Sequence, residues 1–512
     1  MGNKPNNTQN KTDTLQNLKN DFYRLRDPQY GEKYIDDKLS KYESDASRYL
    51  APWYAFSKEA SNVFPSQGLL MTPYDYLNYH TLQMLPQETL IKTLRLRMFF
   101  LEMFNHPYRM QFLKETTNST FLPVPKIPCK ALESALNSGL SLNVGDLGAS
   151  VVGSHKERMS RNERYAKGPF VKLGRQARTL FVGSASPDVW NSAAAVATMA
   201  ASHCLAGIPR NGVLNTVERQ TAMAKEVFVW LEQLKKEILE GRNDKSFVYS
   251  QWKRNVSGTL EASPTKAVER ASALYEAGVT CFRVYSPEPG TGTVDTVKAL
   301  RKEFGNDIEI FTGQIIDIEQ AKRSEEAGAD GLYIGVGGGG RCTTGVRSGS
   351  VIEWPGLLWQ LRGEVSIPVI VEGGASDHVA VTLLLGGAAI SVSRVVSGGT
   401  LESPGGALFC SDGNGKLFKP YGGEASARTK YLDGKLLPFG VPSFVEGETT
   451  KAEMSYVKHV LPTLTYNLHM LIEDSILAMV FRNVENIHQL HALAPSPLRQ
   501  ATSLDLYQRS TH

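Results

Sequence analysis

Eight short apolar runs between residues 180 and 392 constrain the fold more than any other feature of this sequence. Each run is bounded by Gly, Pro, Ser or Asn, and stretches with helical periodicity separate them, among them 267–277, 294–304, 318–327 and 378–385. Strands that alternate with helices pair in parallel, so eight such units indicate an α/β protein with a (β/α)8 TIM barrel. A doubly wound open sheet is the alternative that the same alternation permits. The expected strands are 180–185, 204–209, 256–260, 281–285, 308–312, 331–335, 368–371 and 389–392.

The sixth apolar run continues into a glycine-rich loop that ends in one cysteine. Run and loop together begin at Gly331 and read GLYIGVGGGGRCTTG. Its glycines let backbone N–H groups approach an anion closely, and Cys342 then stands where a thiolate can attack the molecule that carries the anion. We therefore expect Cys342 to be a nucleophile. Cys204 and Cys281 lie within expected strands, where a buried structural thiol is the usual finding.

Three motifs resemble those of the IMP dehydrogenase and GMP reductase family. The segment around Cys342 is similar to the family's G-x-G-x-G-S-x-C-T-T loop, and residues 367–374 (IPVIVEGG) resemble its strand that ends in Asp-Gly-Gly. The segment 402–406 (ESPGG), followed by 410–413 and 421–423, is similar to the family's E-x-P-G…Y-R-G-M-G-S run. The three motifs occur in the family's order with similar spacing, which chance does not readily explain.

The resemblance covers roughly residues 140–480 and implies a purine nucleotide oxidoreductase. In the family, the cysteine matched by Cys342 attacks C2 of the purine and forms a covalent thioimidate, with NAD or NADP(H) as the hydride partner. Thr344 and Glu446 match the pair that handles the proton of the leaving amine in GMP reductases. The flap 426–446 is short, as in reductases, and lacks the Arg-Tyr pair of dehydrogenases. This favours reductive deamination of GMP over oxidation of IMP.

The resemblance also assigns residues to the two ligands. The substrate, a purine nucleoside 5′-monophosphate, is expected to contact the phosphate-binding glycines, the residue at the ribose diol and polar groups after the last strand: Gly339, Gly340, Glu372, Gly373, Gly374, Ser393, Arg394 and Tyr421. The cofactor is expected to contact Tyr285, Ser286, Gln314, Gly335 and Gly337. A monovalent cation, K⁺, is implied at the loop 335–342, and no other metal site is expected.

Several positions depart from the family's pattern. Tyr285 stands for the aspartate that orients the nicotinamide, Gly340 for a phosphate-contacting serine, Glu372 for the aspartate that grips the ribose diol, and Gln314 for an asparagine. A phenol can stack on a nicotinamide but has fewer acceptor positions than a carboxylate. Two alternatives follow, namely a catalytically silent nucleotide-binding or scaffold protein of this fold and a flavin-dependent barrel enzyme.

The sequence also divides into segments. We expect a disordered N-terminus (1–20), a mostly helical extension (21–130), the barrel (131–485) and a C-terminal tail (486–512). Family members often carry a regulatory CBS module between strands two and three, but only 211–255 separates those strands here, so no such module is expected. The aromatic residues of the extension should pack against the barrel or a neighbouring subunit: Trp53, Tyr54, Phe56, Phe99, Phe100 and Phe104.

The composition limits the binding partners and the cellular compartment that we expect for this protein. A net charge of +4 with no recurrent basic block argues against nucleic acid, and the polar start without an apolar segment argues against a membrane protein. Five scattered cysteines form no C-x-x-C pair, which favours a reducing compartment and argues against structural zinc. We therefore expect a cytoplasmic protein, and the resemblance implies a homotetramer.

Overall fold

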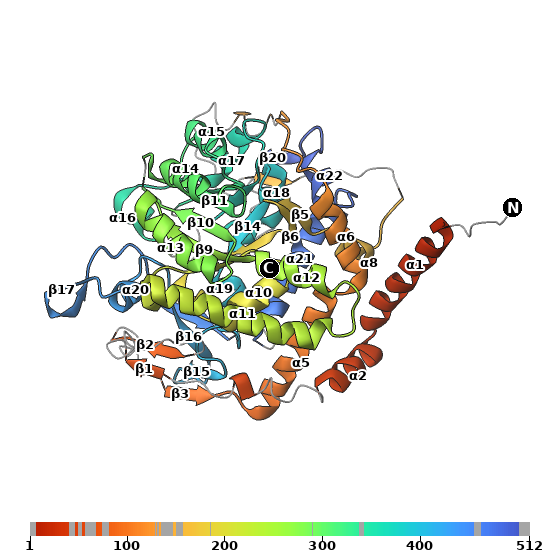
Figure 1. Cartoon of the computed structure of the whole chain (residues 1–512), viewed down its shortest axis with the longest axis horizontal. Coiled ribbons are helices and arrows are strands. Elements are labelled where there is room, and N and C mark those ends of the chain that lie inside the picture. The colour runs from red at the N-terminus through yellow and green to blue at the C-terminus, as the bar shows by residue number, and fades with distance from the viewer. Residues whose placement is uncertain are drawn as a thin grey trace.

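Figure 1 shows the computed structural model of the chain. The structure describes residues 7–39, 47–49, 54–56, 68–73, 81–128, 130, 133–134, 147–149, 157–184, 186–288, 290–336, 342–454 and 462–500.

Eight parallel strands form the central sheet, in the order β7-β14-β13-β12-β11-β10-β9-β8. The two outermost strands meet, because Gly183 N donates to Leu205 O at 2.7 Å and Thr179 N donates to His203 O at 2.7 Å. The sheet therefore closes on itself, and the predicted TIM barrel is confirmed. Its strands are β7 (Phe181–Gly183), β8 (Ala206–Ile208), β9 (Val256–Glu261), β10 (Cys281–Tyr285), β11 (Glu309–Ile315), β12 (Gly331–Ile334), β13 (Val369–Val371) and β14 (Ala389–Val392).

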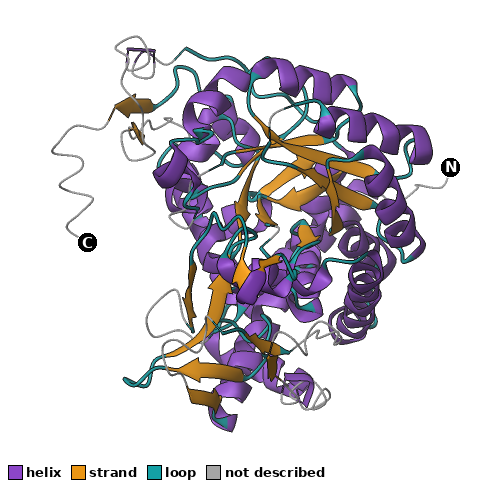
Figure 2. Cartoon of the chain, turned by 90° about the vertical axis from the view of Figure 1, so that its left-hand side faces the viewer, coloured by secondary structure: helices purple, strands orange, loops and turns teal. Residues whose placement is uncertain are grey.

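Helices surround these strands (Figure 2). The four helical stretches expected from periodicity correspond to α13 (Pro264–Glu276), α14 (Gly292–Phe304), α15 (Ile318–Glu326) and α18 (Val379–Leu385). The remaining barrel helices are α8 (Arg161–Lys167), α9 (Pro187–Trp190), α10 (Ala193–Ala201), α16 (Thr344–Ser348), α17 (Trp354–Leu361) and α19 (Arg394–Ser397).

The interval between β8 and β9 holds a crossover and no inserted module. Residues 211–255 are all described, and they form the short 3-10 helix η3 (Gly212–Leu214), α11 (Val217–Leu239) and α12 (Lys245–Arg254). Val227 and Leu231, one helical turn apart on α11, are fully buried. Helix α11 therefore packs against the barrel in this interval, and no regulatory module is inserted.

A hairpin of β5 (Phe170–Leu173) and β6 (Gln176–Thr179) leads directly into β7 and so lies at the N-terminal end of the barrel. Arg178 of the hairpin is fully buried, and its Nη2 lies 2.6 Å from Glu309 Oε2 on β11. The same guanidinium donates to the carbonyl of Arg254 at 2.8 Å. The hairpin therefore closes this end, and the opposite end is left for a site.

The N-terminal extension contains α1 (Asn7–Leu25), α2 (Pro28–Leu39), α5 (Gln87–Phe104) and α6 (Pro107–Asn118). Residues 7–20 are helical, so the expected disorder is wrong over that range. The reason lies in tertiary contacts that the local composition does not reveal. Phe22 and Leu25 are buried at the end of α1, and Lys19 Nζ lies 2.9 Å from Glu163 Oε2.

Helix α5 packs against α21 (Leu464–Val480), which follows the barrel. The Phe100 ring stacks on His469 with 4.4 Å between centroids. Phe100 and Phe104 are buried, as expected for aromatic residues of the extension, whereas Trp53 lies outside the described residues. Arg97 Nε lies 3.4 Å from Glu402 Oε1, with both side chains fully buried, so the extension is also tied to the barrel by charge.

The extension is not wholly helical, because it adds a strand to a second sheet. Strand β3 (Thr81–Met84) pairs antiparallel with β15 (Leu408–Ser411), and β16 (Leu417–Gly422) and β19 (Thr449–Glu453) complete the four strands. Strands β1 (Tyr54–Phe56) and β2 (Leu69–Met71) pair with each other, and Figure 1 shows them beside β3 and β15. More than 300 residues of sequence separate β3 from β15, so no local sequence pattern could indicate that these two strands pair.

Between β16 and β19 the chain forms α20 (Ala427–Leu432) and a small hairpin of β17 (Leu436–Leu437) and β18 (Val441–Pro442). Beyond α21 lie α22 (Ile487–His491) and β20 (Leu498–Gln500), which pairs with β4 (Leu147–Ala149). Ile487 and Leu490 are buried, so the segment expected as a tail contributes to the core as far as α22.

Candidate active site

The predicted site residues follow the C-terminal ends of the barrel strands, where this fold places its active sites. Cys342 follows β12, Glu372 follows β13, and Ser393 follows β14. The glycine loop itself, 337–341, lies outside the described residues, so the roles predicted for Gly337, Gly339 and Gly340 and the K⁺ expected there have no structural description.

Cys342 is the half-exposed member of the four described cysteines, whereas Cys204, Cys281 and Cys410 are buried. Its Sγ lies 3.1 Å from the hydroxyl oxygen of Thr344. Burial raises the pKa of the thiols of Cys204 and Cys281, which keeps them protonated and unreactive. The exposure expected of a nucleophile is therefore found at Cys342.

The segment around Glu446 lies directly against Cys342, although about 100 residues of sequence separate them. Thr343 N donates to Glu446 O at 2.9 Å, and Cys342 and Gly447 form an antiparallel bridge. Glu446 N donates to Ala425 O at 2.9 Å. The Glu446 side chain is exposed and makes no hydrogen bond or ion pair within the part of the chain that the structure describes. The backbone thus brings the three predicted catalytic residues into one neighbourhood.

Glu372 sits at the centre of a polar network at the mouth of the barrel. Arg283, from the middle of β10, donates to both of its oxygens, with Nη1–Oε1 at 3.0 Å and Nη2–Oε2 at 2.7 Å. Ser391 of β14 donates to Oε1 at 3.0 Å, and the Gln314 amide of β11 donates to Oε2. Side chains from three strands therefore converge on one carboxylate.

Sequence reasoning missed Arg283. Its guanidinium carbon lies 3.9 Å from the ring centroid of Tyr333 and 4.8 Å from that of Tyr285. Burial opposes its charge, but the carboxylate of Glu372 outweighs that effect, so the pKa of Arg283 is raised and the pair is ionic. The available signal was an arginine inside the apolar strand CFRVY, because a charge in a buried strand requires a partner.

Three glycines of the site have backbone conformations that other residues rarely adopt. Gly373 and Gly374 have φ of 87° and 82°, in the left-handed region. At Gly335, with φ of 104°, an added Cβ would lie 2.3 Å from the carbonyl oxygen of Glu372. Gly335 therefore lets the ends of β12 and β13 pass each other closely at the site.

At the predicted phosphate end, the hydroxyls of Ser393 and Tyr421 lie 3.0 Å apart. The structure thus joins a residue after β14 to one on β16. Arg394 is half-buried, and among the described residues its side chain has no hydrogen-bond or ion-pair partner. A guanidinium that has no protein partner among the described residues is suited to an anion.

Comparison with known proteins decides the family. The family model described as IMP dehydrogenase / GMP reductase domain matches residues 176–490, which is more than half of the chain. The chain belongs to the IMP dehydrogenase / GMP reductase family.

Individual relatives match over shorter stretches. Inosine-5′-monophosphate dehydrogenase of Toxoplasma gondii is 33% identical over 181 residues, covering 34% of this chain and 32% of that protein. The enzyme of the same name from Mycobacterium leprae (strain TN) is 33% identical over 165 residues, covering 31% and 30%, and that from Aquifex aeolicus (strain VF5) is 28% identical over 204 residues, covering 37% and 40%. The matches thus span about a third of the length of these relatives.

The residues that the family resemblance assigns to a nicotinamide adjoin the Glu372 network. Gln314 N donates to Ser286 O at 2.8 Å, and the ring of Tyr285 covers Arg283. The side-chain oxygen of Gln314 is buried without a hydrogen-bond partner, so an acceptor of the kind that a carboxamide N–H requires is present. These residues therefore fit a nicotinamide, with Tyr285 as a stacking surface.

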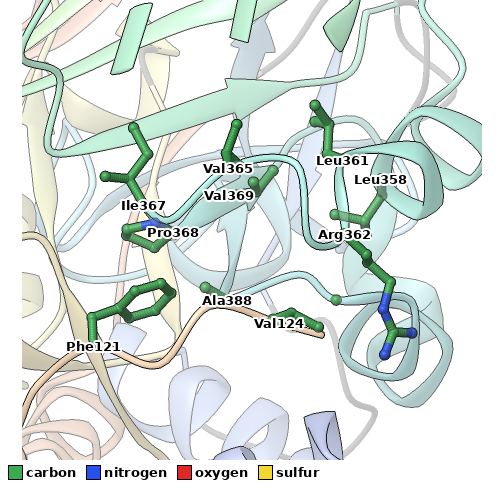
Figure 3. A pocket seen from close by; sticks show the side chains of 11 residues that line it. Phe121, Val124, Leu358, Leu361, Arg362, Val365, Ile367, Pro368, Val369 and Ala388 are labelled. Atoms are coloured by element: carbon green, nitrogen blue, oxygen red, sulfur yellow. The ribbon is translucent and has the colours of Figure 1, made fainter. Parts of the chain in front are cut away.

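A small cavity of about 20 Å³ lies elsewhere, at the N-terminal end of β13 (Figure 3). Phe121 and Val124 of the extension face Ile367, Pro368 and Ala388 across it. Its lining is apolar apart from Arg362, so it belongs to the packing of the extension and not to the site. Among the described residues, no helix is long and apolar enough to cross a membrane, and no group of three His, Cys, Asp or Glu side chains forms a metal site.

Proposed function

We propose that this protein is a purine nucleotide oxidoreductase that acts through Cys342, with reductive deamination of GMP as its preferred reaction. The observation that carries the proposal is the arrangement of Cys342, half-exposed at the mouth of the barrel, beside the Thr344 hydroxyl and the Glu446 segment. In the family, a cysteine at this place attacks C2 of the purine.

The chain's own residues supply the nucleophile and the proton path. Sγ of Cys342 forms a bond to C2, and the amine at C2 departs as ammonia when its bond breaks, which leaves a thioimidate on the cysteine. Sγ of Cys342 donates to the Thr344 hydroxyl oxygen at 3.1 Å, and we assign to this hydroxyl the transfer of the thiol proton towards the departing amine. Glu446, whose carbonyl accepts from Thr343 N at 2.9 Å and whose side chain is exposed, is the second residue proposed for this proton path.

NADH or NADPH, when bound at Tyr285, Ser286 and Gln314, would supply the hydride that ends at C2 as the C2–Sγ bond breaks and the thiolate is released, and the cofactor would leave as NAD or NADP. The choice of reductase over dehydrogenase rests on the Thr344–Glu446 pair and on the short flap. Oxidation of IMP, with hydride transfer to the cofactor, is the alternative reaction. It is the reaction for which the relatives are named.

The substrate's 5′-phosphate is proposed to lie between Gly373, Gly374 and Arg394. The two glycines have no side chain to keep an anion away from their backbone, and Arg394 carries a charge without a partner among the described residues. Ser393 and Tyr421 line the same end.

We also propose a cytoplasmic homotetramer. The β17–β18 hairpin exposes Phe439 and Phe444, which are 103% and 87% accessible, and burial of these rings against another copy would favour assembly. Light scattering on the full chain tests the assembly state, and a monomer would contradict this part of the proposal.

The reaction is tested by following NAD(P)H absorbance with GMP plus NADPH and with IMP plus NAD. We expect oxidation of NADPH with GMP, and a Cys342→Ser variant should lose at least about a thousand-fold in turnover while it still binds nucleotide. Ser350→Ala, an exposed change in the same segment, is the matched control and should retain the wild-type rate. Wild-type turnover in Cys342→Ser would exclude the covalent mechanism, and nucleotide binding without turnover in either direction would indicate a catalytically silent protein.

A further inference from the structure

We propose that the N-terminal extension positions the flap 426–446 against Cys342, and that Arg428 is the positioning residue through which it acts. The family model matches residues 176–490, so the extension lies outside the matched part of the chain. The inference rests on the proposed function, because it gives Glu446, the last residue of the flap, its place in the site.

Arg428 lies in a buried network that joins four segments of the chain. Its Nε donates to both carboxylate oxygens of Asp188, each at 2.9 Å, and the two side chains are 4% and 5% exposed. Its Nη2 donates to the carbonyl of Leu70, on β2 of the extension, at 2.7 Å. Asp188, in the first turn of α9, also accepts from the N–H of Gly422 at 2.7 Å. One guanidinium thus ties together the extension, the barrel, the end of β16 and α20.

The flap meets Cys342 within a few residues of this network. Ser426, the first residue of the flap, forms a parallel bridge with Gly447, which directly follows the flap. Gly447 also forms the antiparallel bridge with Cys342. The N–H of Arg428 donates to the hydroxyl of Thr449 at 3.4 Å. The same residue therefore holds both ends of the flap beside the cysteine.

The second sheet provides an independent link between the extension and the flap. Strand β3 of the extension pairs with β15, β15 pairs with β16, and β16 pairs with β19 (Figure 1). Strand β16 carries Tyr421 and ends just before the flap, and β19 begins at Thr449, just after it. Both strands that flank the flap thus lie in a sheet whose outer strand belongs to the extension.

The position of the flap should matter more for turnover than for binding. Displacement of a catalytic group by about 1 Å can cost about a hundred-fold in rate. The residues proposed for the phosphate, Gly373, Gly374 and Arg394, follow β13 and β14 of the barrel and do not belong to the flap. Arg428→Met should therefore lower kcat with GMP and NADPH about thirty-fold or more and leave KM for GMP within about three-fold.

A second measurement reports on Cys342 itself and does not depend on turnover. The full chain is treated with iodoacetamide, and mass spectrometry follows the modification of each cysteine. The other three described cysteines are buried, so they serve as internal references for intact folding. In Arg428→Met the bridge between Gly447 and Cys342 should open more often, so we expect Cys342 to react about five-fold faster or more, with the buried cysteines unchanged.

Two further variants complete the series. Arg428→Lys keeps the positive charge, but an ammonium group lacks the planar fork that reaches two acceptors in different segments. It should restore part of the turnover and part of the protection of Cys342, and it provides the test if Arg428→Met fails to fold. Lys19→Met is the matched control, because it removes an ion pair of the extension, 2.9 Å from Glu163, that does not involve the flap. Its kcat and its Cys342 reactivity should equal those of the wild type.

The possible results separate the two proposals. Wild-type kinetics and wild-type Cys342 reactivity in folded Arg428→Met, or in Arg428→Lys if the Met variant does not fold, would overturn this inference and leave the proposed function intact. Faster modification of Cys342 in the variant of a protein whose wild type turns over neither GMP nor IMP would overturn the proposed function and support the positioning role. An equal gain of Cys342 reactivity in Lys19→Met would indicate general loosening of the extension and overturn the role of Arg428.

Discussion

Two buried arginine–glutamate pairs lie inside the barrel, one toward each end, and their surroundings differ. Arg178 and Glu309 at the hairpin-covered end have side chains that are 0% and 7% exposed, and Arg283 and Glu372 at the open end have side chains that are 4% and 18% exposed. The covered pair is completed mainly by the backbone: Arg175 N donates to Glu309 Oε1 at 2.5 Å, and the carbonyl of Arg254 accepts from Arg178 at 2.8 Å.

The open pair is completed by side chains instead, since Ser391 and Gln314 share the carboxylate of Glu372. Backbone partners are fixed by the fold, whereas side-chain partners on separate strands can differ while the fold stays the same. The comparison teaches that the same chemical pair is held mainly by the backbone at the covered end and by side chains at the open end, where the sequence predicts contact with a ligand. The following predictions test that division, in order of decreasing effect.

The largest effect is expected at the covered end. Arg178→Met removes the counter-ion of Glu309, a carboxylate with almost no access to water, and should lower the free energy of unfolding by about 3 to 5 kcal/mol. Urea denaturation measures the loss, and nucleotide affinity of the folded variant should stay at the wild-type value. A loss below about 1 kcal/mol would contradict the structural role of this pair.

The same change at the open end should cost less. In Arg283→Met, Glu372 keeps donors from Ser391 and Gln314 and partial contact with water, so we expect a loss of about 2 to 3 kcal/mol. The same urea titration applies. An equal or larger loss than in Arg178→Met would remove the distinction between the two ends.

Arg394 sharpens the comparison, because it lies at the open end without a protein partner among the described residues. Arg394→Ala should weaken binding of a nucleoside 5′-monophosphate by about 1.5 to 3 kcal/mol and leave binding of the nucleoside unchanged. Calorimetric titration of both ligands measures this difference. Equal losses for the two ligands would show that Arg394 does not hold the phosphate.

The smallest effect concerns Asp433, whose side chain meets the chain after β8. Burial raises the pKa of this carboxyl to about 6, and Gly212 N donates to it. Because the folded state binds the proton more tightly than the unfolded state, its contribution to stability is greatest below about pH 4 and is lost as the pH rises through 6. Asp433→Asn lacks this loss, so it should be more stable than the wild type by about 1 to 2 kcal/mol at pH 7.5 and equally stable near pH 4. Urea denaturation at the two pH values tests this, and an unchanged difference between them would contradict it.

Local patterns in the sequence predicted the barrel correctly. The eight expected strands coincide with β7 to β14 within a few residues, because apolar runs of that length and helices with buried faces are properties of short segments. The half-exposed Cys342 follows β12 and the buried Cys281 lies in β10, as expected, whereas Cys204 is buried but precedes β8 instead of lying within it.

The sequence alone therefore determined the fold, the family and the position of the exposed cysteine proposed as nucleophile, since each depends on neighbours along the chain. Only the tertiary structure decided that Arg283 meets Glu372, because 89 residues separate them and the register of the strands between them sets which side chains enter the barrel together. It also decided that residues 7–20 form a helix and that β3 joins the second sheet. These outcomes depend on surfaces that exist only after the barrel has closed, and a local pattern carries no information about them.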